Sequence, residues 1–444
     1  MHHEYLIFNK MERKITEELV NWKNRNDRKP LILLGARQVG KTYILKEFGK
    51  REFRQFIYLN CEKELFSKEL FRDFNVNRIV LELGRYYETS ITPGDTLIVF
   101  DEIQTVPNAI TSLKYFCEDL PELHVASAGS LLGISLREGE SYPVGKVNTL
   151  KIYPMSFSEY LLACGRSSLC EMIESLDWDG MKVMDNLLRE YLRQYYFTGG
   201  MPEAVKTYVE TYDVEKVREV QREILDAYSR DFAKHTKPQV ARIRQVWNNI
   251  PPQLARENKK FIFGAVKKGA RASEFEIAIQ WLLDAGLIYK VNRVKEPLQP
   301  LKFYKDEAAF KLFLLDCGLL ACLIEANPNE MLLGSHAFVD FKGAFTENFV
   351  LQQMMSAGIS SVFYYSKENS TMEIDFLVQA KHGIIPIEVK AEVNVKSKSL
   401  NKFVTVDFNR LSFKGLRISM LPYVDQGWME NIPLYATEAF LSRQ

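Results

Sequence analysis

One set of residues in this chain is spaced for chemistry on phosphate groups. It comprises Gly35, Ala36, Arg37, Gln38, Val39, Gly40, Lys41 and Thr42, which fit GxxxxGK[ST] at every fixed position. The glycines let the backbone wrap closely, so that its N–H groups and a helix N-terminus surround phosphates. Lys41 then reaches the β- and γ-phosphates and the Thr42 hydroxyl ligates Mg²⁺. The segment predicts a P-loop that binds ATP with Mg²⁺.

An acidic pair completes this prediction. The apolar run Thr96–Phe100 has the character of a buried strand and leads directly into Asp101 and Glu102. Alone, such a pair is usually a solvated strand end. After a P-loop it is typical of a Walker B element, in which Asp101 holds Mg²⁺ and Glu102 polarises the attacking water. We therefore predict Lys41 and Glu102 as catalytic, with Thr42 and Asp101 at the metal.

Ser130 is a further candidate, with two interpretations. It follows the strand-like run His124–Ala128, where a polar side chain can sense the γ-phosphate. Equally, it can be the N-cap serine of the next helix. Both interpretations stay open from the sequence.

A second set lies near the C-terminus. Asp375, Glu388 and Lys390 have the spacing D-x12-E-x-K, and Glu347 lies upstream in a helix-like segment. Positions i and i+2 of a strand share a face, so Glu388 and Lys390 point together. Paired carboxylates suit Mg²⁺ or Mn²⁺, with Glu347, Asp375 and Glu388 as ligands, while Lys390 orients a water or stabilises charge on a phosphodiester. We therefore predict Glu388 and Lys390 as catalytic as well. The alternative interpretation is that these side chains simply lie on a solvent-exposed face of a sheet.

The elements that must position the first set form an α/β sheet. Leu31–Leu34 is a short apolar run before the P-loop, and Phe56–Asn60 is another. With the runs at 96–100 and 124–128 they make four strands, which alternate with helical stretches. This order predicts a doubly wound parallel sheet with its site at the carboxyl ends of the strands.

The middle of the chain is predicted to be helical and then basic. Residues 164–234 are helix-like, with a break at Thr198–Pro202. Helices at Val240–Leu254 and Arg271–Ala285, followed by a strand at Leu287–Val294, favour a winged helix-turn-helix. Winged helices also serve as protein-interaction modules or internal lids, so the alternative to DNA binding is a purely structural role.

Charge separates this basic segment from the rest. Residues 237–305 carry 14 Lys and Arg against 5 Asp and Glu, although the whole chain has a net charge of +1. Five cations precede or begin the second predicted helix: Lys259, Lys260, Lys267, Lys268 and Arg271. Such a cluster suits phosphate contacts, so we expect nucleic acid, specifically DNA, to bind through residues 237–305.

The C-terminal pattern predicts a mixed α/β domain of the restriction-endonuclease type. A helix at Phe345–Met355 precedes strands at Val362–Tyr365, Ile374–Gln379 and Ile384–Ala391. The predicted domains are an ATPase domain at 1–163, a helical subdomain at 164–236, a winged-helix-like module at 237–305 and a nuclease-like domain at 306–444.

Composition gives the broad limits. A chain of 444 residues suits roughly two to four domains. The most hydrophobic segment, Phe310–Ile324, is interrupted by Lys311 and Asp316, so we predict a buried helix pair and no membrane span. The apolar stretch Tyr5–Phe8 is too short for a signal-peptide core, and the six cysteines form no CxxC pair. We expect reduced thiols and a cytoplasmic location.

Taken together, these motifs resemble prokaryotic AAA-type ATPases whose C-terminal portion is a domain of unknown function with a PD-(D/E)XK nuclease-like core. The resemblance covers nearly the whole chain. The segments that carry it, in order, are Gly35–Thr42, Val99–Gln104, Ala128–Leu132, Ile152–Tyr160, Thr198–Ala204, Asp316–Leu320, Gly343–Gln352, Glu373–Phe376 and Pro386–Lys390.

The resemblance implies ATP binding, hydrolysis and a DNA-related role, with a homo-oligomer as a plausible assembly. In one respect the chain departs from many members, because Gly145-Lys146 stands where they have Gly-Arg. A lysine neutralises γ-phosphate charge without a bidentate fork. Arg137 or Arg230 could substitute. An alternative function is an ATP-operated regulatory switch whose nuclease-like domain binds nucleic acid or protein without cleavage.

Overall fold

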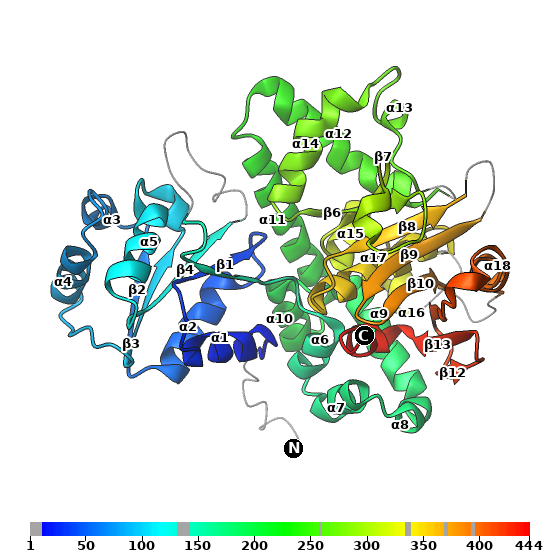
Figure 1. Ribbon diagram of the computed structural model, residues 1–444, viewed down its shortest axis with the longest axis horizontal. Coiled ribbons are helices and arrows are strands. Elements are labelled where there is room, and N and C mark those ends of the chain that lie inside the picture. Colours follow the sequence, from blue (N-terminus) through cyan, green and yellow to red (C-terminus); the bar gives the residue numbers. More distant parts are fainter. Residues whose placement is uncertain (1–10, 131–142, 257–258, 334–338, 368–371, 392–395) are drawn as a thin grey trace. The chain divides into compact units, whose positions relative to one another are not determined.

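The protein forms two compact units. The computed structural model describes residues 11–130, 143–256, 259–333, 339–367, 372–391 and 396–444. The first unit comprises residues 12–153 with 284–286, and the second comprises residues 154–283 and 287–444. Within the described ranges, the first unit contains a five-stranded sheet and the second an eight-stranded sheet (Figure 1).

All strands of the first unit run parallel, in the order β2-β3-β4-β1-β5. Their bounds are β1 Leu31–Gly35, β2 Gln55–Asn60, β3 Thr96–Asp101, β4 His124–Ser130 and β5 Asn148–Lys151. The predicted doubly wound P-loop sheet is confirmed, and β5 adds an edge strand to the four predicted. Strand β3 is buried throughout, as expected for a strand covered on both faces.

Helices connect these strands. They are α1 Ile15–Asn24, α2 Lys41–Glu52, α3 Phe66–Leu70, α4 Val76–Tyr86 and α5 Ala109–Asp119. Ile32, Ile98 and Phe100 from the strands pack with Ile79 of α4 and Leu113 of α5 in one core cluster. The sheet therefore has a rigid apolar support behind the ends of β1 and β3.

The second unit begins with helices. Their bounds are α6 Phe157–Ala163, α7 Ser167–Ser175, α8 Trp178–Val183, α9 Asp185–Thr198, α10 Pro202–Thr211, α11 Val214–Phe232, α12 Lys237–Leu254, α13 Phe263–Val266 and α14 Ala272–Asp284. The predicted break after Thr198 is present, because Gly199 ends α9 with φ 72° and Pro202 starts α10.

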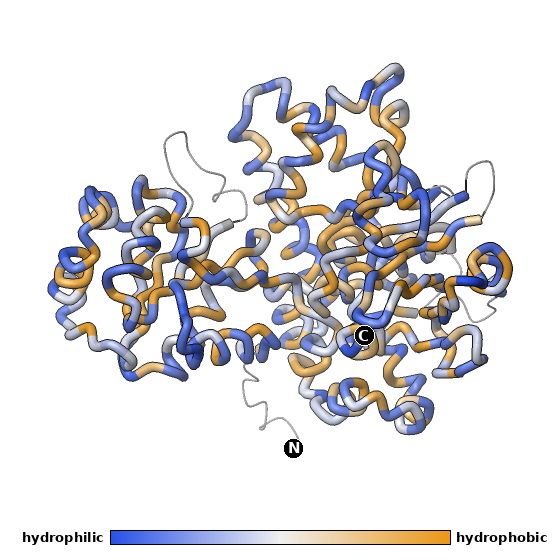
Figure 2. Tube along the Cα trace, in the orientation of Figure 1, coloured by the Kyte–Doolittle hydropathy of each residue, from blue (hydrophilic) through white to orange (hydrophobic). Residues whose placement is uncertain are grey.

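The sheet of this unit has the order β12-β13-β11-β10-β9-β8-β6-β7 and is mixed. Its strands are β6 Ile288–Val294, β7 Lys305–Leu314, β8 Val362–Ser366, β9 Glu373–Ala380, β10 Gly383–Val389, β11 Gly415–Ser419, β12 Val424–Asp425 and β13 Met429–Pro433. The remaining helices are α15 Cys317–Leu323, α16 Pro328–Leu333, α17 Val339–Ser356, α18 Lys398–Lys402 and α19 Thr437–Leu441. Figure 2 shows hydrophobic and hydrophilic residues interspersed along helices and strands alike.

The helix pair predicted at Phe310–Ile324 is wrong. Strand β7 ends at Leu314, and only Cys317–Leu323 is helical. A short apolar run bounded by polar residues fits a buried strand as well as a helix, and the pairing of β7 with β6 decides the outcome here.

The strand predicted after the two helices of the basic segment belongs to the large sheet. Strand β6 pairs antiparallel with β7 on one side and parallel with β8 on the other. The strand at 288–294 thus exists where predicted, but its second neighbour comes from residues far along the chain.

A buried carboxylate ties distant segments of this unit together. Asp316 accepts hydrogen bonds from Gly200 N (2.6 Å), Leu319 N (2.9 Å) and Gln352 Nε2 (3.0 Å). A Cβ at Gly200 would lie 2.1 Å from the Met155 carbonyl oxygen, so only glycine fits there. Since Gln352 lies on α17, this cluster also fixes the helix that carries Glu347.

Candidate functional site

The P-loop joins β1 to α2 through two residues with left-handed backbone. Gln38 has φ 66° and Gly40 has φ 95°, directly before α2 begins at Lys41. Lys41 Nζ donates to the carbonyl oxygens of Gly35 (2.9 Å) and Ala36 (2.7 Å). The lysine is therefore folded over the loop, where its ammonium group can transfer from carbonyl oxygens to phosphate oxygens.

Burial changes the acidity of this lysine. Lys41 is 7% exposed, and desolvation lowers its pKa to about 8, although the carboxylates of Glu102 and Asp101 act in the opposite direction. A phosphate placed beside it would restore the charged form.

The Walker B aspartate meets the P-loop threonine. Asp101 ends β3 and is 2% exposed, and its Oδ2 accepts from Thr42 Oγ1 (2.7 Å) and Tyr58 Oη (2.6 Å). Its other oxygen accepts from Glu102 N (3.0 Å). A hydroxyl and a carboxylate in direct contact are the oxygen ligands that Mg²⁺ takes at a P-loop, so these two residues fit the ion.

Glu102 is held in an uncommon backbone conformation. Its φ of 50° and ψ of 40° lie in the left-handed region, which costs of order 1–3 kcal/mol for residues other than glycine. The Glu102 carboxylate accepts from Gln104 Nε2 (2.6 Å), and Gln104 Oε1 is buried without a hydrogen-bond partner. The amide of Gln104 thus restrains the carboxylate predicted to polarise water.

Two supporting residues were not predicted. Arg13 is 7% exposed and donates to the carbonyl oxygens of Val39 (3.0 Å) and Tyr153 (2.7 Å), which fixes the P-loop from outside its own segment. Tyr58 reaches Asp101 from the neighbouring strand β2. Neither has a local sequence signal, although Tyr58 lies two residues before the end of a predicted strand beside β3.

The structure describes only some of the residues that are candidates for contact with the γ-phosphate. The side chain of Ser130 and the whole of Arg137 lie outside the described residues. Lys146 is half-buried and pairs with Glu118 (3.0 Å). Arg230 is exposed on α11, in the second unit.

The C-terminal candidates come from three elements of the second unit. Glu347 lies on α17, Asp375 on β9, and Glu388 on β10 just before Lys390. Lys390 Nζ lies 2.9 Å from Glu388 Oε1, as the i, i+2 spacing predicts, and Val389 N donates to Asp375 Oδ2 (2.8 Å). The antiparallel pairing of β9 with β10 therefore brings Asp375, Glu388 and Lys390 together.

Lysines neutralise these carboxylates. Glu347 pairs with Lys259, which follows α12, and lies 3.9 Å from Lys311 of β7. Lys311 is fully buried and also pairs with Glu373. We call Glu347, Glu373, Asp375 and Glu388 with Lys259, Lys311 and Lys390 the acid–lysine cluster.

The pKa values of Asp375 and Glu347 in this cluster are shifted in opposite directions. Burial and the negative charge of Glu347 raise the pKa of Asp375. Burial also acts to raise the pKa of Glu347, but the ammonium groups of Lys259 and Lys311 outweigh it and lower that pKa. The cluster thus places a carboxyl group with a raised pKa beside one with a lowered pKa.

A divalent ion does not fit this cluster as arranged. Among the described residues, no three of His, Cys, Asp and Glu are grouped so that they could hold a metal. However, Glu347 Oε2 and Glu388 Oε2 are buried and accept no hydrogen bond. The donor chemistry suits Mg²⁺, whereas the carboxylates are turned to lysines.

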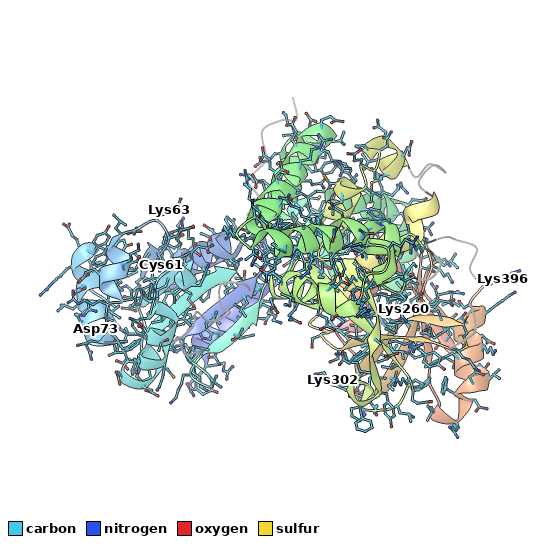
Figure 3. The ribbon with its side chains drawn as sticks, turned by 90° about the horizontal axis from the view of Figure 1, so that it is seen from above. Cys61, Lys63, Asp73, Lys260, Lys302 and Lys396 are labelled. Carbon is cyan, nitrogen blue, oxygen red and sulfur yellow. The ribbon has the colours of Figure 1, made fainter. Side chains whose placement is uncertain are left out.

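Several cations of the basic segment have partners within their own unit. Lys259 pairs with Glu347, and Arg293 pairs with Asp306 (2.6 Å). Lys267, Lys268 and Arg271 are exposed. Lys260 and Lys302, labelled in Figure 3, belong to the same segment.

The strand-end loop, its buried lysine and the Thr42–Asp101 contact define a P-loop nucleotide-binding domain. Residues 27–161 match the family model described as an AAA domain, so this part of the chain is a P-loop ATPase domain of the AAA class. Residues 189–330 and 342–426 match two models described as domains of unknown function, DUF8612 and DUF4143. No curated protein matches the chain.

The solved structures similar to this chain include the following two, both of low identity. The Walker-type ATPase PABY2304 of Pyrococcus abyssi shares 14% identity, with 71% of this chain and 96% of that one covered and a TM-score of 0.45. Cdc6p from Pyrobaculum aerophilum shares 12% identity, covering 72% of this chain and 92% of that one, with a TM-score of 0.25. No helix among the described residues is long and apolar enough to cross a membrane.

Proposed function

We propose that this chain is a Mg²⁺-dependent ATPase that couples its nucleotide state to a nucleic-acid-binding segment and a nuclease-like domain. The contact between Thr42 Oγ1 and Asp101 Oδ2, 2.7 Å long, beside the buried Lys41, carries the ATPase part. It supports ATP and Mg²⁺ as cofactors of residues Gly35–Thr42.

Each residue of the P-loop site then has a defined task. Backbone N–H groups of the loop bind the phosphates, and Lys41 moves its ammonium group from the Gly35 and Ala36 carbonyls to the β/γ-phosphates. Thr42 and Asp101 would hold Mg²⁺, which supplies charge neutralisation at the phosphates. Glu102 orients the attacking water once Gln104 releases its carboxylate.

ATP hydrolysis by single variants tests this proposal. We expect Lys41→Ala to lose nucleotide binding, and Glu102→Gln to bind ATP but hydrolyse it at least about a hundredfold more slowly, because it cannot polarise water. Exposed Lys68→Ala is the matched control. Full hydrolysis by Lys41→Ala would show that the P-loop assignment is wrong.

The basic segment is proposed to bind DNA through its exposed cations. Lys267, Lys268 and Arg271 support this, because exposed cations can release counterions from phosphates. Fluorescence anisotropy with labelled oligonucleotides at several salt concentrations is the test. Each neutralised contact residue should reduce the salt slope by about 1, whereas unchanged slopes in Lys267→Gln and Lys268→Gln would exclude them.

The four domain ranges predicted from sequence remain part of this proposal, as does a nuclease-like function for residues 306–444. Support comes from the placement of Asp375 and Glu388 on adjacent antiparallel strands with Lys390 beside them. A cleavage assay on single-stranded DNA, double-stranded DNA and RNA, with Mg²⁺ or Mn²⁺ and with or without ATP, is decisive if Asp375→Asn is assayed in parallel.

A second candidate is an ATP-operated switch that binds nucleic acid or protein without cutting. The lysine pairing of Glu347 and Glu388 favours it, because the carboxylates are neutralised without a metal. Equal, background-level cleavage by wild type and Asp375→Asn, together with ATP-dependent oligonucleotide binding, would select the switch.

A homo-oligomer is proposed as well, since AAA-type sites are often completed by a neighbouring subunit. Exposed Arg230 is one candidate for that contribution. Light scattering after gel filtration, with and without ATP, measures the assembly. If Arg230 acts between subunits, Arg230→Ala should lower hydrolysis without lowering ATP binding.

A further inference from the structure

A pocket of the second unit shares no lining residue with the P-loop or with the acid–lysine cluster. It is formed by α13, α14, β6 and β7, which are labelled in Figure 1, and has a volume of about 560 Å³. Pockets of roughly 300–1,000 Å³ are typical of small-molecule sites. Most of the lining is apolar, and its larger side chains are Phe263, Ile277, Ile279, Leu283 and Phe310. The pocket therefore has the size and the walls to hold a small apolar body.

Part of this apolar lining is open to solvent. Ile277 of α14 is 64% exposed, whereas Phe310 and Ile279 of the same lining are 5% and 4% exposed. The rings of Phe263 and Phe310 pack edge to face, with centroids 6.0 Å apart. An aromatic ligand can pack against them in the same way and release water from Ile277. The lining thus favours a ligand with a ring.

One cation belongs to this lining. Lys290 of β6 is half-buried, and its Nζ lies over the Phe310 ring, 4.4 Å from the ring centroid. Within the part of the chain that the structure describes, its ammonium group forms no ion pair and no hydrogen bond. Because an ammonium group has three N–H donors, Lys290 can offer them to a ligand in the pocket.

The charges around Lys290 favour an anion beside it. Burial lowers the pKa of Lys290, and the cation of Lys305 acts in the same direction. The carboxylates of Glu307 and Glu276 act in the opposite direction without offsetting these two effects. Glu307 pairs with Lys305 (2.9 Å), and Glu276 is exposed on α14. An anionic ligand group would therefore stabilise the ammonium form of Lys290.

We propose that this pocket binds a small aromatic carboxylate, with its ring against Phe263 and Phe310 and its carboxylate on Lys290. The site goes beyond the ATPase and nucleic-acid functions proposed above and requires neither of them. A nucleic acid fits this pocket less well, because α14 carries three carboxylates and no Lys or Arg. A cationic ligand would meet Lys290.

Binding of 2-naphthoate to the full chain tests the proposal, with neutral 2-naphthamide as the matched probe. Isothermal titration calorimetry measures both affinities. For wild type we expect the carboxylate to bind on the order of tenfold more tightly than the amide, because only the carboxylate forms a charge-assisted hydrogen bond with Lys290. Lys290→Met should reduce binding of the carboxylate to the level of the amide, whereas Lys290→Arg should retain most of the preference.

A second variant fills the pocket without changing its charge. Ala308 lines the pocket and is exposed, so Ala308→Trp should abolish binding of both probes and leave the fold intact. Exposed Lys302→Met, between β6 and β7 and outside the lining, is the matched control and should bind both probes like wild type. Urea unfolding followed by circular dichroism checks that each variant is folded.

The possible results decide for or against the pocket. Equal affinities of wild type for the two probes, or a preference for the carboxylate that persists in Lys290→Met, would refute the role of Lys290 and with it the proposal. Binding that Ala308→Trp leaves unchanged would place the probes elsewhere on the chain, and no binding of either probe up to its solubility limit would also overturn the proposal. If Lys290→Met does not fold, the comparison of the two probes on wild type and on Ala308→Trp still decides the outcome.

Discussion

Binding of MgATP is expected to take up a proton at the P-loop, and the pH dependence of that uptake follows from Lys41. Burial lowers the pKa of Lys41 to about 8. About half of the molecules then carry a neutral amine at pH 8. Phosphate oxygens favour the ammonium form, so the neutral half must gain a proton when ATP binds.

The size of this effect can be worked out from that pKa. Uptake should be about 0.1 proton at pH 7, about 0.5 at pH 8 and about 0.9 at pH 9. The charged fraction falls about tenfold between pH 7 and pH 9, so the apparent affinity for ATP should fall about tenfold, or about 1.4 kcal/mol. The γ-phosphate is already ionised over most of this range.

The lowered pKa of Lys41 also makes the free energy of unfolding depend on pH. The folded-state pKa lies below the usual 10.5, so the fold disfavours the ammonium form. This group destabilises the free protein by about 3 kcal/mol below pH 8, and the penalty is lost as pH rises from about 8 to 10.5. Nucleotide removes the penalty at lower pH, because the phosphates replace the lost hydration.

Calorimetry with a non-hydrolysable ATP analogue measures the uptake. Binding enthalpies in buffers of different ionisation enthalpy give a line whose slope is the number of protons gained. Lys41→Arg is the control, since a guanidinium remains charged throughout and should show no uptake from this position. A zero slope for wild type at both pH 8 and pH 9 would refute the reasoning, as would equal uptake by Lys41→Arg.

Three further changes have expected outcomes. Tyr58→Phe removes the 2.6 Å hydrogen bond to Asp101, so the Mg²⁺ concentration for half-maximal hydrolysis should rise about tenfold with a smaller change in kcat; an unchanged Mg²⁺ requirement would exclude a role for Tyr58. Arg13→Met leaves the Val39 and Tyr153 carbonyls without this donor and should weaken ATP binding about tenfold, measured by fluorescent nucleotide titration. Asp316→Ala should reduce the free energy of unfolding in urea by about 3–5 kcal/mol, because three donors lose their acceptor, whereas exposed Asp179→Ala should change it little.

The P-loop could be predicted because its signals are local. The apolar run before Gly35, the fixed glycines and the Lys41-Thr42 pair lie within a dozen residues of one another. Tyr58 and Arg13 escaped prediction because each acts through a contact with a distant segment. No periodicity in the sequence indicates that Arg13 will contact the Val39 carbonyl oxygen.

The C-terminal site could also be predicted only where its residues lie close together in the sequence. The spacing of Asp375, Glu388 and Lys390 predicted their proximity, because two consecutive antiparallel strands carry them. Lys259 was interpreted as a phosphate contact, whereas it pairs with Glu347, 88 residues away. A charge in a sequence does not reveal whether its partner is solvent, a ligand or a buried carboxylate.

Hydrophobicity alone also misassigned one element. Phe310–Leu314 and Cys317–Leu323 are both apolar, but the first is a strand and the second a helix. Asp316 separates them, as the N-cap whose side chain accepts from Leu319 N. Only the pairing of β7 with β6 distinguishes the two halves, and that pairing is set by the whole sheet.

The position of β6 in the large sheet has a consequence for synthesis on the ribosome. The first unit's last strand, β5, ends at Lys151, so its sheet can close early during translation. By contrast, β6 ends at Val294, and its second edge stays unpaired until β8, which begins at Val362, has been synthesised. At 5–20 residues per second the delay is roughly 3–14 s. During that interval an unpaired strand edge is open to wrong partners, so the nascent chain should be most vulnerable to aggregation there.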